Sequence, residues 1–167
     1  MPDSSAAERT PDGHFLVIGG RRWRASDPSI PDKLRQELVD ELMSARRGVK
    51  ARAELARVRV GDAKVALGER GHPWWEAAPA GAMEARIEST IRALLRHRET
   101  STICPSDVAR VVGGERWRDR MDDVRRVAGT LAEADRVVIT QRGEPVDLAS
   151  VKGPVRIGKG RAFDAQD

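Results

Sequence analysis

The segment Ser101–Arg142 constrains the fold of this chain more than any other part of its sequence. It begins with a short helix, because Pro105 suits the first helical turn and Asp107 lies near the positive end of the helix dipole. Gly113-Gly114 then ends that helix, since glycine is a poor helix former and readily adopts the conformations of a turn. The sequence therefore predicts a short helix followed directly by a tight turn.

A longer amphipathic helix is predicted next, over Glu115–Glu133. Its apolar residues recur at helical spacing and form one face: Trp117, Met121, Val124, Ala128 and Leu131. Val137–Thr140 is rich in β-branched residues and predicts a strand, with Pro154–Ile157 as its returning partner. Met83–Arg98 supplies a further helix ahead of the segment. Three helices followed by a two-stranded wing form the architecture of a winged helix-turn-helix.

A β-hairpin is predicted near the N-terminus. Phe15–Ile18 favours a strand, Gly19-Gly20 favours a two-residue turn, and Arg21–Arg24 returns as the second strand. An isolated hairpin is only marginally stable in water. We therefore expect this hairpin to pack on another element.

Residues 31–69 have a helical period throughout, and Ser29 is expected to cap the start of the helix. The apolar seam advances by three or four residues at each step, through Leu34, Leu38, Leu42, Ala45, Val49, Ala53, Ala56, Val60, Ala63 and Leu67. Either one long helix or an antiparallel helical hairpin bent near Gly48–Glu54 fits this period. We favour the hairpin, because a single long helix would leave its Ala-rich half uncovered. Gly61 indicates a close contact within the second helix, since glycine costs about 1 kcal/mol there relative to alanine.

These elements divide the chain into two units. A β-hairpin plus helical hairpin occupies residues 13–76, and a winged-helix domain occupies residues 83–160. Residues 77–82 form a linker, residues 1–12 a disordered tail and residues 161–167 a second tail. The predicted fold class is α+β, mainly α, with a winged helix-turn-helix preceded by a β-hairpin plus helical hairpin.

The composition is typical of a soluble protein with a charged surface, since 34% of the residues are charged and the formal net charge is +4. No apolar run approaches the roughly 20 residues that span a bilayer. The N-terminus also lacks the apolar segment of a signal peptide. We therefore expect a cytoplasmic protein with no membrane partner. One Cys and three scattered His exclude a disulfide framework and offer no metal-ligand spacing, so no cofactor is expected.

Two groups of basic residues are candidates for nucleic-acid binding. One lies on the outward face of the Glu115–Glu133 helix, which enters the major groove in a helix-turn-helix, and the other lies in the wing, where cations contact phosphates. The predicted binding residues are Arg116, Arg120, Arg125, Arg126, Arg142, Lys152 and Arg156. The centre of the helix face is mostly acidic, however. Asp122 is spaced to pair with Arg118 and Arg126, which favours the alternative of a self-paired, solvated surface.

Three other motifs have both a structural and a functional interpretation. Trp23 within Arg21–Arg24 is suited to stacking on a base beside phosphate-binding arginines, although a tryptophan on a hairpin more often covers the helices beneath it. Trp74-Trp75 is more typical of an aromatic staple between the two halves than of a ligand platform. Cys104 is interpreted as a structural helix cap, because no histidine is placed by spacing to activate its thiol.

Several short motifs resemble a known family. They are Ile103–Arg110, Gly114, Trp117-Arg118, Met121, Val124-Arg125, Ile139–Asp147 and Gly153–Arg156. With these motifs, residues from about 83 to 158 are similar to an uncharacterised bacterial winged-helix family, domain of unknown function 3253. The resemblance implies a fold and no activity. The segments GRRWRASDPSIP and KVALGERGHPWWE of the N-terminal half resemble the region that accompanies this domain in some bacterial proteins.

We therefore expect a small nucleic-acid-binding or regulatory protein without catalytic activity, and double-stranded DNA is its expected partner. The alternative is a protein-interaction adaptor that uses the winged helix or the helical hairpin to dock an unidentified protein. An enzyme is disfavoured, because no constellation of nucleophile, base and oxyanion donor can be assembled from these residues.

Overall fold

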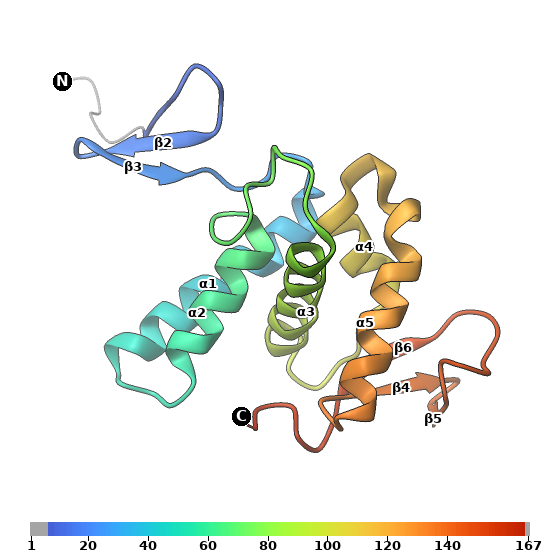
Figure 1. The fold of residues 1–167 in the computed structure, drawn as a ribbon. Coiled ribbons are helices and arrows are strands. Elements are labelled where there is room, and N and C mark those ends of the chain that lie inside the picture. Colours follow the sequence, from blue (N-terminus) through green and yellow to red (C-terminus); the bar gives the residue numbers. More distant parts are fainter. Residues whose placement is uncertain (1–6, 166–167) are drawn as a thin grey trace.

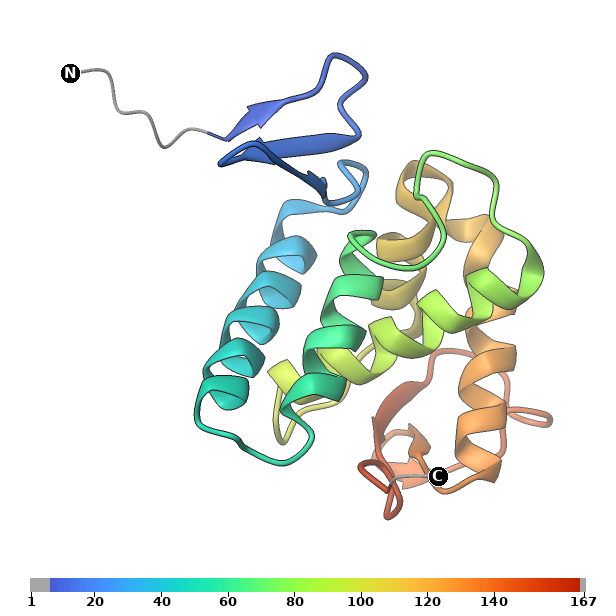
Figure 2. The ribbon, with the colours of Figure 1, turned by 60° about the vertical axis from the view of Figure 1, so that its left-hand side comes forward.

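The computed structural model describes residues 7–165, in which a layer of helices lies between two small β-sheets (Figures 1 and 2). In chain order the elements are β1 (Glu8–Arg9), β2 (Phe15–Ile18), β3 (Arg21–Arg24), α1 (Asp32–Lys50), α2 (Ala56–Leu67), α3 (Ala80–His97), α4 (Pro105–Gly113), η1 (Gly114–Arg120), α5 (Met121–Glu133), β4 (Val137–Gln141), β5 (Glu144–Pro145) and β6 (Arg156–Lys159). The predicted fold class, α+β and mainly α, is confirmed.

Residues 31–69 form a helical hairpin rather than one long helix. α2 returns beside α1 (Figure 2). The helices pack tightly at Gly48, where an added Cβ would lie only 3.1 Å from the Cβ of Ala56. At Gly61 the neighbour is a flexible side chain and not the other helix. A Cβ added there would lie 3.7 Å from the guanidinium of Arg70.

Both ends of the chain are more ordered than predicted. Glu8–Arg9 pairs with the open edge of β2, with Glu8 opposite Val17, so residues 8–12 do not belong to a disordered tail. The rest of that expected tail, residues 1–6, lies outside the described residues. At the other end Phe163 is 4% exposed and packs against the core. Burial of its ring anchors part of the predicted tail 161–167.

The predicted cap at Ser29 is wrong. α1 begins one residue after Pro31, and no side chain caps its first turn. The hydroxyl of Ser29 donates instead to Oδ1 of Asp27 at 2.7 Å. Ser29 bonds to Asp27 and not to the helix because the carboxylate of Asp27 is buried, and a buried charge requires hydrogen-bond donors around it.

One apolar core runs through both predicted units. Leu38 of α1 and Leu67 of α2 lie fully buried, as do Ile91 and Leu94 of α3. α3 packs against α1 and α2 and also against α4 and α5. Residues 80–82 of the predicted linker already belong to this shared helix, and the two halves have a common hydrophobic interior.

The C-terminal half contains the expected three helices and a small sheet. Its strands lie in the order β5-β4-β6, and β4 pairs antiparallel with β6, with Ile139 opposite Ile157. Val124, Ala128 and Leu131 of α5 are buried. The predicted inward face of this helix is therefore confirmed, and Trp117 and Met121 extend it as partly buried residues packed against the core.

The predicted helix Glu115–Glu133 is interrupted at its start. Gly114–Arg120 forms the 3₁₀ helix η1, and α5 begins only at Met121. Gly114 has a φ of +56°, and a Cβ at this position would lie 2.8 Å from the Cβ of Ser29. Position 114 therefore requires glycine, because any side chain there would collide with Ser29. The positive φ of Gly114 also makes a turn that a continuous α-helix does not contain.

Candidate nucleic-acid interface

The predicted arginines near the start of α5 are engaged by carboxylates. Arg116 pairs with Asp119 at 3.2 Å, and Arg120 pairs with Asp123 at 3.3 Å. Arg126 contacts both Glu84, at 2.7 Å, and Asp123, at 3.1 Å. Hydrogen bonds to Glu84 and then Asp123 raise the pKa of Arg126. The expected self-pairing occurs, but through Asp123 at i,i+3 rather than through Asp122 at i,i+4.

The other predicted binding residues lie in or near the sheet formed by β5, β4 and β6. Arg142 and Lys152 are exposed and, within residues 7–165, form no ion pair with a carboxylate. Arg142 has a φ of +51° in the turn that joins β4 to β5. Arg156 donates through Nε and Nη2 to the hydroxyl and carbonyl oxygens of Thr102. Arg125 is half-buried and lines a cavity beside the β5–β6 loop.

The structure therefore does not unite the seven predicted residues in one positive surface. η1 lies at the start of α5, whereas the sheet that contains β4 and β6 lies beside the later turns of that helix (Figure 1). Between them, the outward face of α5 presents paired charges. Among the residues described, only the β5-β4-β6 sheet and its loops supply predicted cations that are exposed and without a carboxylate partner.

A second electrostatic pattern crosses the boundary between the halves. Two arginines of α3 and the arginine that follows it bind carboxylates of the first half: Arg86 binds Asp27 at 2.9 Å, Arg96 binds Asp62 at 2.5 Å, and Arg98 binds Glu37 at 2.7 Å. The hydrogen bonds that Arg98 donates to the carboxylate of Glu37 raise the pKa of Arg98. Within the first half, Arg59 also holds Glu41, which is 2% exposed.

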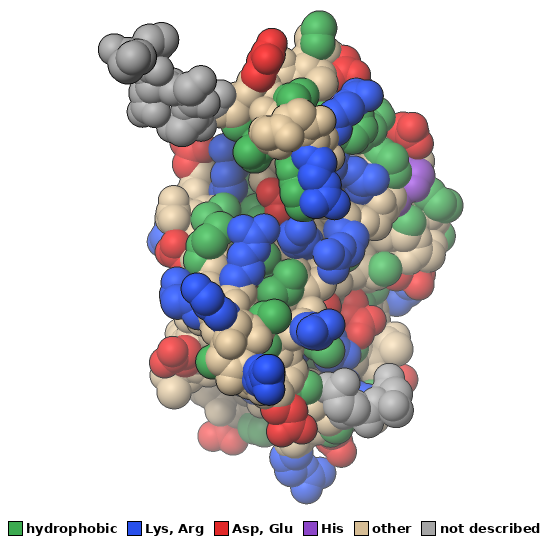
Figure 3. All heavy atoms as spheres, turned by 90° about the vertical axis from the view of Figure 1, so that its left-hand side faces the viewer, with side chains coloured by type: hydrophobic (Ala, Val, Ile, Leu, Met, Phe, Trp, Pro, Cys, Tyr) green, Lys and Arg blue, Asp and Glu red, His purple; other side chains and the backbone are tan. Residues whose placement is uncertain are grey.

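These ion pairs leave the surface of the first half strongly basic. Its cations without a carboxylate partner in the described structure are Arg21, Arg22, Arg24, Lys33, Arg35, Arg46, Arg47, Lys50, Arg52, Arg57, Lys64 and Arg70. Its carboxylates without a basic partner there are only Asp32, Asp40, Glu54 and Glu69. Figure 3 shows the result, because Lys and Arg gather across the middle of this side while Asp and Glu lie mainly near its edges.

We define the basic face as Arg21, Arg46, Arg57, Lys64 and Arg70. The guanidinium of Arg21 lies 4.8 Å from the centre of the Trp23 ring, and the ammonium of Lys64 lies 5.7 Å from it. Burial lowers the pKa of Lys64, and the positive charges of Arg70 and Arg46 lower it further against the opposite effect of Glu69.

Sequence reasoning identified the hairpin arginines but missed the helical part of the basic face. The only local signal was the spacing of Arg57 and Lys64, which lie two helical turns apart on one side of α2. Arg46 lies on the other helix, α1, so its place on this face depends on the packing of α1 against α2.

The arginines of β3 are held against aromatic rings. Arg22 lies 4.4 Å from the centre of the Phe15 ring, and Arg24 lies 5.6 Å from that of Trp75. Trp75 also stacks on His14 at 3.9 Å. The Trp74-Trp75 pair therefore fastens the β-hairpin to the loop between α2 and α3, a more specific role than the predicted staple between halves.

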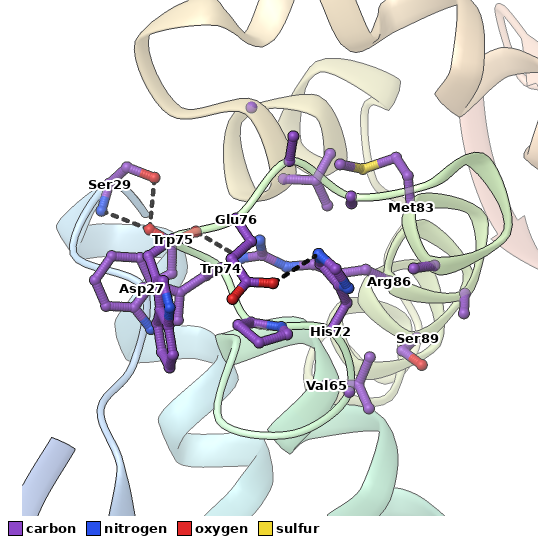
Figure 4. Close-up of a pocket in the computed structure, with 18 of the residues that line it drawn as sticks. Asp27, Ser29, Val65, His72, Trp74, Trp75, Glu76, Met83, Arg86 and Ser89 are labelled. Carbon is purple, nitrogen blue, oxygen red and sulfur yellow. Dashed lines mark hydrogen bonds and ion pairs between the residues drawn. The ribbon is translucent and has the colours of Figure 1, made fainter. Parts of the chain in front are cut away.

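A cavity of about 600 Å³ lies beneath that same loop, between α3 and the end of α4 (Figure 4). Arg86 crosses it to reach Asp27, and His72 lies 3.9 Å from Glu76 at its side. Met83 contributes to the apolar wall. Asp27 and Arg86 are thus paired across the cavity, and this ion pair ties the first half to α3.

Cys104 lies away from this cavity and acts as the predicted cap. It precedes α4 in a capping box in which its backbone N–H donates to Asp107 at 3.2 Å. The hydroxyl of Ser106 donates to its sulfur at 3.0 Å. Among the described residues no cluster of His, Cys, Asp and Glu is arranged to hold a metal ion.

A family model matches most of the C-terminal half. Residues 84–160 match the family described as protein of unknown function, DUF3253. The matched segment extends from the first turns of α3 to just beyond β6, which confirms the resemblance expected from the sequence. The basic face lies outside the DUF3253 segment. No curated protein matches the chain. None of the helices described is both long enough and apolar enough to cross a membrane.

Proposed function

We propose that this protein is a nucleic-acid-binding protein that contacts the phosphate backbone of duplex DNA through the basic face. The observation that carries the proposal is the segregation of charge, because α3 arginines neutralise first-half carboxylates and leave first-half cations exposed. Such a surface attracts a regularly charged polyanion. The proposal includes no catalytic step.

The C-terminal half has a supporting role in this proposal. We interpret it as a winged helix-turn-helix whose wing adds phosphate contacts through Arg142 and Lys152. The carboxylates around α5 make it a poor reader of the major groove, since they repel phosphates and occupy the arginines that would bind guanine. Binding is therefore expected to depend weakly on base sequence, as it does for contacts made mainly to phosphates.

Duplex binding should depend steeply on salt. If about five cations of the basic face contact phosphates, a double-logarithmic plot of the association constant against salt concentration should have a slope of about −4. Fluorescence anisotropy of a short labelled duplex, titrated between about 50 mM and about 200 mM salt, measures this slope. Absence of duplex binding even at the lowest salt would overturn the proposal.

The protein-interaction adaptor remains the second candidate function. The observation that favours it is the charge-balanced outward face of α5, which suits a partner protein better than DNA. An adaptor would form a stoichiometric complex with that partner and would not show the steep salt dependence expected for DNA.

A further inference from the structure

Trp23 differs from the other three tryptophans of the chain in its surroundings. Trp74 donates its indole N–H to a backbone carbonyl oxygen, Trp75 stacks on a histidine ring, and Trp117 packs against the core. Trp23 is 41% exposed, and among the described residues its ring contacts no other aromatic ring and its indole N–H donates no hydrogen bond. The fold therefore leaves part of a large flat ring open to a ligand.

The register of the first sheet explains why this ring stays exposed. Trp23 lies opposite Leu16, and Arg21 lies opposite Ile18. Because successive residues of a strand point to opposite faces, these four residues share one face of the sheet, which we call the Trp23 face. The hairpin is held by its other face, where Phe15 packs edge-on against a tryptophan of the loop between α2 and α3. The Trp23 face is thus left towards solvent, on strands that project beyond the helices (Figure 1).

Cations accompany Trp23 on this face. The guanidinium of Arg21 and the ammonium of Lys64 lie 4.8 Å and 5.7 Å from the centre of its ring. Arg9 of β1 lies in the same cross-strand row and adds a third cation. Within the three described strands the acidic residue is Glu8, which belongs to the opposite face. An aromatic ring among positive charges suits a ligand that is both planar and anionic.

A nucleotide with an unpaired base combines these two properties. Its base can stack on the ring of Trp23 while its phosphates contact the neighbouring cations. A base inside a duplex cannot stack there, because base pairs cover both of its faces. Stacking displaces the guanidinium of Arg21 from the ring, and this exposed side chain is then placed beside the phosphates of the stacked nucleotide. An acidic peptide would pair with the cations but would leave the ring in water.

We propose that Trp23 is a stacking platform for an unpaired base, with Arg21 and Lys64 as the cations that contact the adjoining phosphates. The inference rests on the proposed function and narrows the partner to DNA that carries a single-stranded segment beside a duplex. The other cations of the basic face then hold the duplex. Every base has a flat face that can stack, which agrees with the weak dependence on base sequence that we expect for this protein.

Overhangs that differ only in their bases test this site. We expect the protein to bind a duplex with an overhang of about four thymidines roughly 10-fold more tightly than the same duplex with an abasic overhang, which carries the same phosphates. Trp23→Ala should remove this difference. Trp23→Phe should keep most of it, because a phenyl ring also stacks on bases. Fluorescence anisotropy of the full chain at one salt concentration measures all of these affinities.

The matched control is Ile18→Ala, which removes another exposed apolar side chain from the Trp23 face. It should leave the preference for thymidines over abasic sites unchanged. If Ile18→Ala abolished that preference as fully as Trp23→Ala, the preference would depend on the hairpin as a whole and the stacking platform would be wrong. Circular dichroism of each variant checks that the fold is retained.

The possible outcomes separate this inference from the proposed function. If blunt duplex binds and the wild type has equal affinity for both overhangs, the stacking platform is wrong and the function stands. If blunt duplex fails to bind while thymidine overhangs bind through Trp23, the platform stands and the duplex contact is wrong. If neither blunt nor overhanging DNA binds at low salt, both proposals fail.

Discussion

Replacement of Arg46, Lys64 and Arg70 together by glutamine should weaken duplex binding about 100-fold near physiological salt, which corresponds to about 2.7 kcal/mol. Each substitution removes one charged contact to phosphate, and none of them breaks an ion pair within the described fold. The slope of the salt dependence should fall in magnitude by roughly 3. Anisotropy titrations of wild type and variant at several salt concentrations measure both quantities.

The matched control removes the same number of charges from the other candidate surface. Arg116→Gln, Arg120→Gln and Arg126→Gln together should weaken binding less than about 3-fold, because these arginines are already paired with carboxylates. Retained helical circular dichroism would establish that both triple variants fold. If the variant of Arg116, Arg120 and Arg126 lost more duplex affinity than the variant of Arg46, Lys64 and Arg70, the binding surface would lie on η1 and α5 and not on the basic face.

Arg86→Met should lower the free energy of unfolding by about 3–5 kcal/mol, the cost typical of breaking a buried ion pair on one side. Asp27 is 5% exposed and would lose its cationic partner. The carbonyl oxygens of Ala66 and Val111 would lose a donor from the same guanidinium. Urea denaturation followed by circular dichroism measures the change, and one cooperative transition is expected because both halves share a core.

A double-mutant cycle identifies the source of this loss. Asp27→Asn combined with Arg86→Met should be less destabilised than the sum of the single variants, since no buried charge remains unpaired. Strict additivity would mean that Asp27 and Arg86 act independently, which would contradict the assignment of the ion pair as the connection between the halves.

The helical parts of the fold were predictable because they depend on local periodicity. The apolar faces of residues 31–69 and of α5 recur at helical spacing, and most of their residues are buried as expected, although Ala53 lies exposed in the connection between α1 and α2. The division at η1 was not predictable, because it depends on contact between Gly114 and Ser29, which are distant in the sequence. The strand at Glu8–Arg9 was missed for a similar reason, since pairing with β2 outweighs its weak strand propensity.

The candidate site was predictable only in part. Composition indicated a basic protein, and the sequence indicated correctly that the α5 face could pair its own charges. The basic face depends on which carboxylates are neutralised elsewhere, and Asp27 and Arg86 are 59 residues apart in the chain. The structure also shows which carboxylates occupy three of the predicted binding residues: Asp119 pairs with Arg116, Asp123 with Arg120, and Glu84 with Arg126.

An NMR titration with a short duplex at low salt would show directly which surface binds DNA, because every backbone amide and tryptophan indole reports separately. We expect the largest chemical-shift changes in β3, including the indole of Trp23, and around Arg46, Lys64 and Arg70, with smaller changes at Arg142 between β4 and β5. Changes confined to η1 and α5, with an unaltered Trp23, would contradict binding through the basic face.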